Sequence, residues 1–270
     1  MPSTPRPGPV RESRPAQLLA GLAFLWAAAL PLLAAPYVNM GPSELPMDQP
    51  RVAVEILTPP GEEDSDSLGP GLFNTFLLDT GANGVIAAGQ AVTELENAGF
   101  ETVAVYDEAG VAGTTPFDVS APYLLDVAGS DGVRNRLANV RLLASENANF
   151  GGFNGIVGMP AMIDRVTTLD LTVWSGGTLS LMNVFFSADT PPVDPHRYTV
   201  PLELVEFERE GQRHPEDPLP AWAPLPFADA EVAHKGNTVA GSYLVDTGAQ
   251  MCIISTDTAL ALGLDENGDG

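Results

Sequence analysis

A single cysteine, Cys252, is present among the 270 residues of the chain. This scarcity excludes an intramolecular disulfide framework and a cysteine-rich zinc site. Basic residues are also few, because 12 Lys and Arg stand against 35 Asp and Glu, which gives a formal net charge of −23. A surface of that sign repels phosphate backbones, so we expect no nucleic-acid partner.

The sequence signs of a serine hydrolase and of a histidine-based metal site or catalytic triad are missing as well. No serine stands in a Gly-x-Ser-x-Gly turn, which leaves a serine hydrolase without its nucleophile. His196, His214 and His234 lie in separate polar or Pro-rich contexts, with no spacing typical of a metal site or a catalytic triad. Aromatic residues make up only 7%, whereas 27 Gly and 25 Pro favour a β-rich, loop-rich globule.

Residues 1–36 have the layout of an export signal. Three arginines precede an uncharged run from Leu18 to Ala35 that ends in small residues, where cleavage could occur. The run is nearly long enough to span a bilayer, so an uncleaved N-terminal anchor is the alternative. We therefore expect a secreted, periplasmic or cell-surface protein, with residues 37–50 as an irregular tether.

Periodicity and breaker residues predict many short strands and two helices. Residues 189–200 are rich in Pro and predict a linker. Strands are expected at Arg51–Leu57, at two apolar runs around Asp79–Gly84, and at Thr102–Tyr106, Phe117–Val127, Arg134–Leu143, Thr167–Val173 and Thr178–Met182. Helices are expected at Gln90–Gly99 and Thr256–Leu264, and a loop is expected at Pro59–Gly71.

The segment after the linker partly repeats the one before it. LFNTFLLDTGANGVIAAG aligns with VAGSYLVDTGAQMCIIST, which matches Asp79 to Asp246, 167 residues later. Cys252 then takes the place of Val85 and is expected to be a buried, small apolar side chain. Further upstream, Tyr198–Glu208 is expected to correspond to Arg51–Leu57, and His214–Pro226 to Pro59–Gly71.

Both copies place Asp-Thr-Gly-Ala directly after an apolar strand. A given tripeptide arises by chance roughly 0.03 times in a chain of this length, so a matched pair is informative, although one copy alone would be read as an ordinary turn. The expected roles are a carboxylate for Asp79 and Asp246, a hydroxyl bonding neighbouring backbone for Thr80 and Thr247, and a close backbone approach for Gly81 and Gly248. Two carboxyls forced together share one proton, so one can act as general base while the other polarises a carbonyl.

These features resemble the aspartic peptidases, whose signature is Asp-Thr/Ser-Gly in each of two related lobes. Ile156, Val157 and Gly158 look like the apolar-apolar-Gly element that lies behind the catalytic loop in that family. The family also has a β-hairpin flap, and the stretch Tyr106–Thr115 is similarly placed, with Gly110 and Gly113 as its hinge or tip. Tyr123 marks an alternative hairpin.

The resemblance implies a mostly β, pepsin-like bilobal fold in which the second lobe is incomplete. Residues 51–188 would form the first lobe and residues 201–270 a partial second lobe, with Asp79 and Asp246 as the dyad. Ala82 and Ala249 are closer to the retroviral-type branch, whereas the covalent duplication is pepsin-like. The implied function is an exported aspartic endopeptidase that hydrolyses polypeptides through an activated water, without a cofactor, as a monomer.

Only 24 residues follow Asp246, too few for a second flap and a second apolar-apolar-Gly element. We expect either a fragment of a longer protein, which is favoured, or a degenerate second lobe. Two alternatives stay open: a non-catalytic binding or adhesion protein that retains the peptidase fold, and a retropepsin-like homodimer in which Asp79 meets its symmetry mate.

The final residues carry a weaker signal for a structural calcium ion. Asp265, Asn267, Asp269 and Gly270 match positions 1, 3, 5 and 6 of a calcium loop. The acidic residue that such a loop needs at position 12 lies beyond the end of the sequence. A plain polar turn is the alternative.

Overall fold

A computed structural model of the chain describes residues 49–59, 65–110, 113–129, 132–170, 183–187, 195, 199–209, 211 and 213–264. The chain divides into two compact units, residues 1–43 and 44–270, and every described residue belongs to the second. The expected export signal at 1–36, the strand at Thr178–Met182 and the calcium loop therefore lie outside the described residues. Within those residues, no helix has the length and apolar character needed to cross a membrane.

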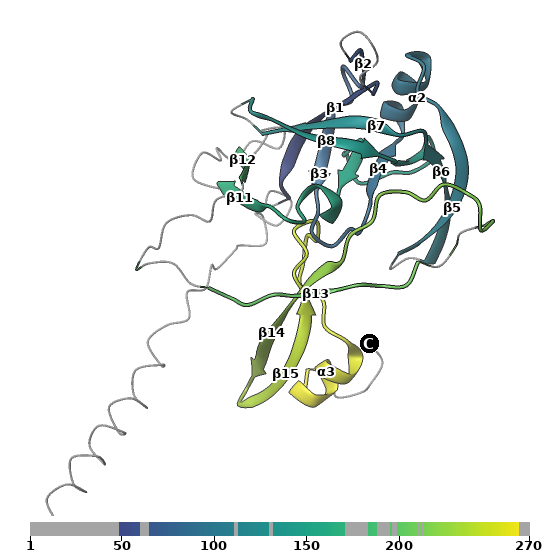
Figure 1. The fold of residues 1–270 in the computed structure, drawn as a ribbon. Coiled ribbons are helices and arrows are strands. Elements are labelled where there is room, and N and C mark those ends of the chain that lie inside the picture. Colours follow the sequence, from purple (N-terminus) through teal and green to yellow (C-terminus); the bar gives the residue numbers. More distant parts are fainter. Residues whose placement is uncertain are drawn as a thin grey trace, which may run out of the picture. The chain divides into compact units, whose positions relative to one another are not determined.

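Ten strands form one mixed sheet (Figure 1). The strands are β1 (Arg51–Leu57), β2 (Ser67–Gly69), β3 (Thr75–Leu78), β4 (Val85–Ala88), β5 (Thr102–Gly110), β6 (Gly113–Ser120), β7 (Tyr123–Ala128), β8 (Arg134–Val140), β9 (Leu143–Ser145) and β10 (Gly155–Val157). Their order is β5-β6-β9-β4-β10-β3-β1-β7-β8, with β2 paired to β1. The β10–β3 and β4–β9 pairs are parallel and the others are antiparallel, so the expected mostly β class is confirmed.

Apolar side chains pack on both faces of this sheet, and its central strands are therefore buried on both sides. In β1 the alternate residues Val52, Val54 and Ile56 are buried, as the period of two predicts. Phe76 and Leu78 of β3 join them in the larger core cluster. Leu77, between those two, points the other way into a second cluster with Tyr106, Phe117 and Ile156. The strand that leads to Asp79 is thus held from both faces.

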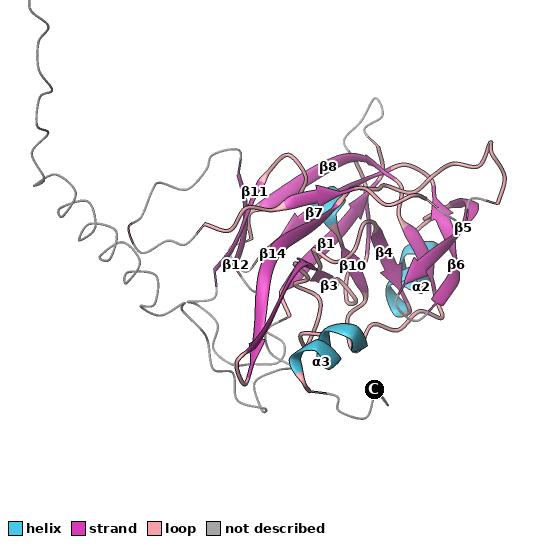
Figure 2. Cartoon of the chain, turned by 90° about the horizontal axis from the view of Figure 1, so that it is seen from below, coloured by secondary structure: helices cyan, strands magenta, loops and turns pink. Residues whose placement is uncertain are grey.

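The predicted apolar-apolar-Gly element is found as β10, between β3 and β4 (Figure 2). Glycines flank this strand where neighbouring atoms leave no room for a side chain. A Cβ on Gly155 would collide with the Phe76 ring and the Ile86 carbonyl, and one on Gly158 with the carbonyls of Ala82 and Gly84. The glycines therefore let β10 lie directly against the turn that follows β3.

Substituting Gly155 by Ala tests this close packing. The new methyl group meets a backbone carbonyl as well as a ring, so relief requires the strands to separate; overpacking of this kind lowers the free energy of unfolding by about 2–3 kcal/mol. Gly84→Ala is the matched control, because its Cβ would stand 3.6 Å from the nearest atom. Urea denaturation should separate the two variants, and equal midpoints would contradict the packing described.

The predicted helices are confirmed with shorter limits. The first, α2, spans Gln90–Asn97 and buries Ala91, Val92 and Leu95. The second, α3, spans Thr256–Leu262; the Ser255 hydroxyl caps it by accepting a hydrogen bond from the Thr258 N–H, and Gly263 ends it with a φ of 70°. A short 3₁₀ turn, η2 (Met159–Ala161), follows β10.

Two strands predicted as continuous are interrupted. The expected strand at Phe117–Val127 divides into β6 and β7 around Pro122, which has no N–H to extend a ladder. The expected strand at Arg134–Leu143 divides into β8 and β9 at Arg141 and Leu142, shortly after Asn139, whose φ is 59°. The expected strand at Thr167–Val173 is found as β11 (Val166–Asp170), paired with β12 (Asn183–Ser187).

A separate three-stranded sheet comprises β13 (Glu203–Val205), β14 (Leu225–His234) and β15 (Asn237–Leu244). The hydrogen bonds of this sheet contradict the alignment of the two copies that is expected upstream of the second Asp-Thr-Gly-Ala motif. The N–H of Leu78, which precedes Asp79, donates to the Pro50 carbonyl at 2.9 Å, and the N–H of Val245 donates to the Pro226 carbonyl at the same distance. The counterpart of β1 is therefore β14.

The expected matches of Tyr198–Glu208 to Arg51–Leu57, and of His214–Pro226 to Pro59–Gly71, are wrong. The physical reason is the length of the connection between the paired strands. The β14–β15 hairpin closes through Lys235 and Gly236, both with positive φ, as a tight two-residue turn requires. The connection from β1 to β3 is much longer and includes β2. Outside the motif itself, equivalent strands of the two copies are therefore not separated by the same number of residues as the two motifs are.

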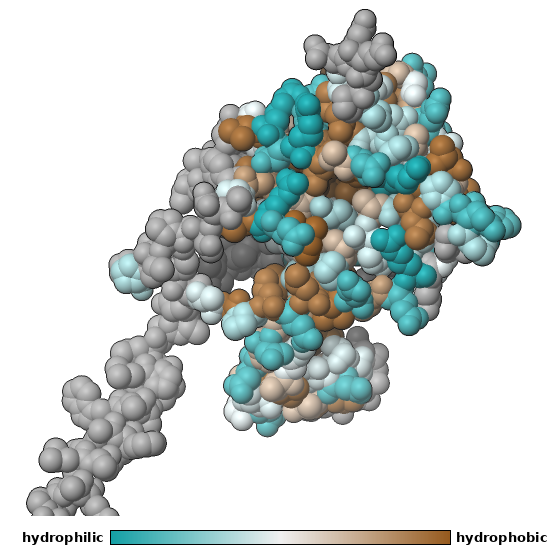
Figure 3. All heavy atoms as spheres, viewed as in Figure 1, coloured by the Kyte–Doolittle hydropathy of each residue, from teal (hydrophilic) through white to brown (hydrophobic). Residues whose placement is uncertain are grey.

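The second motif also lacks the support that follows the first. After Asp79 the chain continues into β4, which is held between β10 and β9. After Asp246 the described residues contain no strand, and Cys252–Ile254 is irregular. Cys252 is exposed rather than buried as expected, Met251 is 62% exposed and Ile253 75%. Further exposed hydrophobic residues lie at and around β13, where Figure 3 shows apolar surface: Val200, Leu202, Leu204 and Phe207.

Amide hydrogen exchange should report this difference between the two halves. Amides of β3 lie in the centre of a ten-stranded sheet, whereas β15 is an edge strand with exposed residues at alternate positions. We expect exchange at Leu77 and Leu78 to be slower than at Tyr243 and Leu244 by about two orders of magnitude or more, which corresponds to ~3 kcal/mol of extra opening free energy. Equal protection factors would show that the second half is independently stable.

Candidate active site

The two Asp-Thr-Gly-Ala turns lie against each other, at the ends of β3 and β15. Each threonine bonds across to the other turn, which the repeat alone could not show. The Thr80 N–H donates to the Thr247 hydroxyl at 3.1 Å, and the Thr247 N–H donates to the Thr80 hydroxyl at 3.0 Å. In return, the Thr80 hydroxyl donates to the Val245 carbonyl at 2.5 Å, and the Thr247 hydroxyl to the Leu78 carbonyl at 2.9 Å. The arrangement has approximate twofold symmetry.

The glycines of the two turns are required by proximity. A Cβ on Gly81 would stand 2.5–2.7 Å from the carboxyl atoms of Asp246, and a Cβ on Gly248 would collide with the carboxyl of Asp79. Neither glycine has a positive φ, so the backbone conformation itself would tolerate other residues. Each glycine leaves space for the aspartate of the opposite turn.

The two carboxyl groups consequently meet, and the backbone supplies donors to both. The Gly81 N–H donates to Asp79 Oδ1 at 2.7 Å; the N–H groups of Gly248 and Ala249 donate to Asp246 Oδ1 at 2.8 and 3.0 Å. Burial raises the pKa of Asp79 to about 7, and the negative charge of Asp246 and a hydrogen bond to it act in the same direction. Asp79 thus keeps its proton up to about neutral pH.

A hairpin occupies the position of the expected flap. Strands β5 and β6 pair antiparallel up to Gly110 and Gly113, the two predicted hinge residues, and Gly113 has a φ of 112°. Tyr106, midway along the hairpin, is buried and meets the Trp222 ring edge-on at 6.4 Å between centroids. The alternative hairpin residue, Tyr123, stacks on Phe100 and belongs to the core.

Sequence reasoning missed the contacts that hold this hairpin from its outer side. The segment between β13 and β14 runs along the free edge of β5, where the Asp107 N–H donates to the Gly211 carbonyl at 3.2 Å. Arg213 pairs with the Asp107 carboxylate at 2.8 Å. The sequence predicts a Pro-rich loop at His214–Pro226, and neither the composition nor the charge of this segment indicates a partner.

Glu108, on the same hairpin, was also missed. It lies two residues beyond Tyr106 and so on the same face of β5. One of its carboxylate oxygens is buried with no hydrogen-bond partner among the described residues, and burial raises the pKa of Glu108 from 4.5 to about 7. The folded chain retains this proton at a pH where the unfolded chain has released it.

Glu108 should therefore make stability depend on pH. Proton uptake by Glu108 on folding contributes to the free energy of unfolding. This contribution is fully present below pH 4.5 and is lost as the pH rises through about 7. We expect Glu108→Gln to match the parent Tm at pH 4 and to exceed it by about 2 °C at pH 8, a small shift because the side chain is only half-buried. Glu96→Gln, at an exposed position of α2, is the control. Equal shifts at both pH values would refute the assignment.

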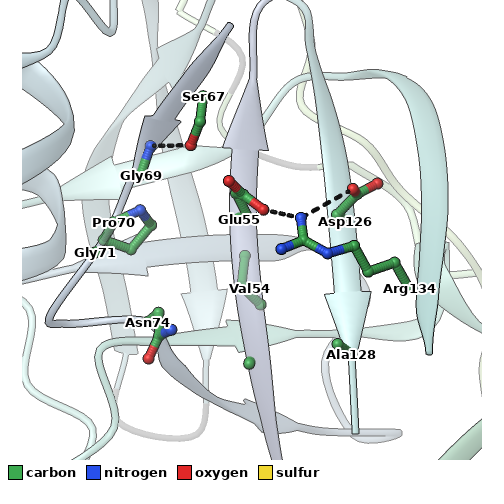
Figure 4. Close-up of a pocket in the computed structure, with 11 residues that line it drawn as sticks. Val54, Glu55, Ser67, Gly69, Pro70, Gly71, Asn74, Asp126, Ala128 and Arg134 are labelled. Atoms are coloured by element: carbon green, nitrogen blue, oxygen red, sulfur yellow. Dashed lines mark hydrogen bonds and ion pairs between the residues drawn. The ribbon is translucent and has the colours of Figure 1, made fainter. Parts of the chain in front are cut away.

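Other charged groups lie in a pocket away from the two turns. This pocket of about 230 Å³ is bordered by β1, β2, β7 and β8, and Arg134 extends between Glu55 and Asp126 (Figure 4). Asp126 is only 3% exposed, and Arg136 binds both of its oxygens at 2.8 and 2.9 Å. These charges compensate one another, which indicates a structural role.

The remaining sequence candidates do not gather at the dyad. His214 is exposed in a turn, His234 ends β14, and His196 is outside the described residues. Over the part of the chain that the structure describes, no three His, Cys, Asp or Glu side chains are grouped so as to hold a metal ion. Asp265, Asn267 and Asp269 fall beyond residue 264, the last one described.

Comparison with known proteins adds no further assignment. No protein-family model matches the chain, and no curated protein matches it either. The geometry of the two turns is therefore the feature of this chain that bears on its function.

Proposed function

We propose that this chain is an aspartic endopeptidase that hydrolyses peptide bonds with a water held between Asp79 and Asp246. The observation that carries the proposal is the reciprocity of the two turns. Each glycine leaves room for the opposite carboxyl, and each threonine bonds the opposite strand. A single β-turn needs none of these contacts, because an Asx hydrogen bond closes within its own residues.

The chemistry follows from one proton shared by two carboxyls. The ionised member takes a proton from water, and the water oxygen forms a bond to the peptide carbonyl carbon. The protonated member donates to the carbonyl oxygen, which becomes a hydroxyl. Collapse of this tetrahedral adduct breaks the C–N bond: the amine leaves with the proton that the first aspartate took from water, and one hydroxyl of the adduct returns its proton to the second aspartate as the carboxylic acid forms. The dyad then again holds one proton. No covalent enzyme intermediate and no cofactor is part of this proposal.

The pepsin-like bilobal fold is the architecture that best supports this chemistry. Strands β1, β3, β4 and β10 would form the catalytic part of the first lobe, residues 51–188, and β14, β15 and α3 that of a smaller second lobe, residues 201–270. A substrate would lie extended between them and pair with backbone edges, with the β5–β6 hairpin closing over it. With both aspartates in one chain, a monomer suffices, which disfavours the retropepsin-like homodimer.

The dyad proposal predicts that both aspartates are needed for turnover. Asp79→Asn and Asp246→Asn should each reduce peptide hydrolysis by at least ~10²-fold, the usual contribution of general acid–base catalysis. Because the pKa of Asp79 is raised to about 7, Asp79→Asn should also increase the Tm at pH 8 while leaving it nearly unchanged at pH 3, below the ordinary Asp pKa of 3.8. Function and stability thus move in opposite directions.

The assay uses the full chain on a mixed peptide library from pH 3 to 8, with and without pepstatin. Asp118→Asn is the matched control, since Asp118 is an exposed carboxylate on β6. Near-normal turnover by either dyad variant would reject the assignment. A well-folded parent protein that cleaves nothing at any pH would favour the alternative, a binding or adhesion protein with the peptidase fold.

A further inference from the structure

We propose that Gln49 is a positioning residue for the second Asp-Thr-Gly-Ala turn, an inference that rests on the proposed peptidase function. Gln49 lies just before β1, 199 residues from Gly248 in sequence. Its side-chain amide nevertheless donates from Nε2 to the Gly248 carbonyl at 2.5 Å. The same amide accepts at Oε1 from Gln250 Nε2 at 3.1 Å, which fixes its orientation.

The bonded carbonyl belongs to the peptide group that faces Asp246. The Gly248 C=O and the Ala249 N–H lie in one planar unit, so holding one end fixes the other. The Ala249 N–H donates to Asp246 Oδ1 at 3.0 Å. Gln49 thus holds this peptide from the side opposite the carboxylate, and its hydrogen bond polarises the peptide and strengthens the donor that Asp246 receives.

The first turn obtains the same support from β10 and η2. The Asp79 N–H donates to the Val157 carbonyl at 3.0 Å; the carbonyls of Ala82 and Gly84 accept from Met159 and Gly158 at 2.8 and 3.0 Å. Among the described residues after Asp246, no strand performs this task for the second turn. Gln49 instead donates to the Gly248 carbonyl, one residue before the position at which the first turn is held through its Ala82 carbonyl.

The residue of the second half that corresponds to Gln49 cannot hold the first turn in the same way. Since Pro226 takes the place of Pro50, the residue that corresponds to Gln49 is Leu225, which is buried in the larger core cluster and has no side-chain donor. A neutral amide also suits a position beside two carboxyls. It offers a donor and an acceptor together without adding a charge that would bias their shared proton.

Three variants of the full chain test the role. Gln49→Ala removes both hydrogen bonds; Gln49→Met keeps the length of the side chain without a donor for the Gly248 carbonyl and without adding a charge; Gln250→Ala removes only the bond that orients the amide. We expect Gln49→Ala and Gln49→Met to lower kcat about tenfold with KM within about twofold of the parent, because a lost hydrogen bond of ~1.4 kcal/mol acts on the reacting pair and not on distant substrate contacts. Gln250→Ala should show a smaller loss.

A second measurement does not depend on activity. Exchange of the Ala249 amide, followed by NMR, should accelerate in both Gln49 variants while the β3 amides keep their parental rates. Parental kcat and parental Ala249 exchange in Gln49→Met would overturn the inference. If Gln49→Ala unfolds, Gln49→Met, which has nearly the same length and no charge, carries the test. An inactive parent protein would reject the proposed function, whereas the exchange result would still decide whether Gln49 holds the turn.

Discussion

Each of the two turns is completed by groups that belong to the other. The hydroxyl of Thr80 is satisfied by the strand before Asp246, and that of Thr247 by the strand before Asp79. Polar groups at a half-buried position need such partners, since leaving one unbonded is destabilising by about 1–3 kcal/mol. Neither turn can therefore hold this conformation alone, and the position of both carboxyls depends on the contact between the two halves of the chain.

The two turns contact each other symmetrically, but the structure that surrounds the first turn differs from the structure that surrounds the second. The first turn is set in a ten-stranded sheet with apolar residues on both faces, and β10 packs directly behind it. The second turn follows an edge strand, and Asp246 is exposed whereas Asp79 is half-buried. The half-buried position of Asp79 explains why burial raises its pKa. The second turn has a side chain from the start of β1, Gln49, bonded to its Gly248 carbonyl.

Much of the site could be predicted from the sequence because the motif carries its own constraints. Asp, Thr and Gly each have a physical reason to stand where they do, and those reasons apply twice. Strand and helix positions followed from period and capping, as β1 and α3 illustrate. The alignment of the two copies upstream of the motif, by contrast, could not be predicted. It depends on the length of the β14–β15 hairpin connection, which local periodicity does not show. Gln49, Glu108 and the Gly211 contact depend on residues far away along the chain, so no local pattern could reveal them.

The threonine pair joins positions 167 residues apart, and this separation has a consequence for the order of folding. Contacts of long sequence separation form late, because the entropy of closing a large loop must be met before they give any stabilisation. The first sheet can collect its local hairpins early, while the dyad assembles only after β14 and β15 reach it. Under the proposed function, a partly folded chain would therefore have no hydrolytic activity, and the order of assembly alone would protect the chain from cleaving its own unfolded neighbours.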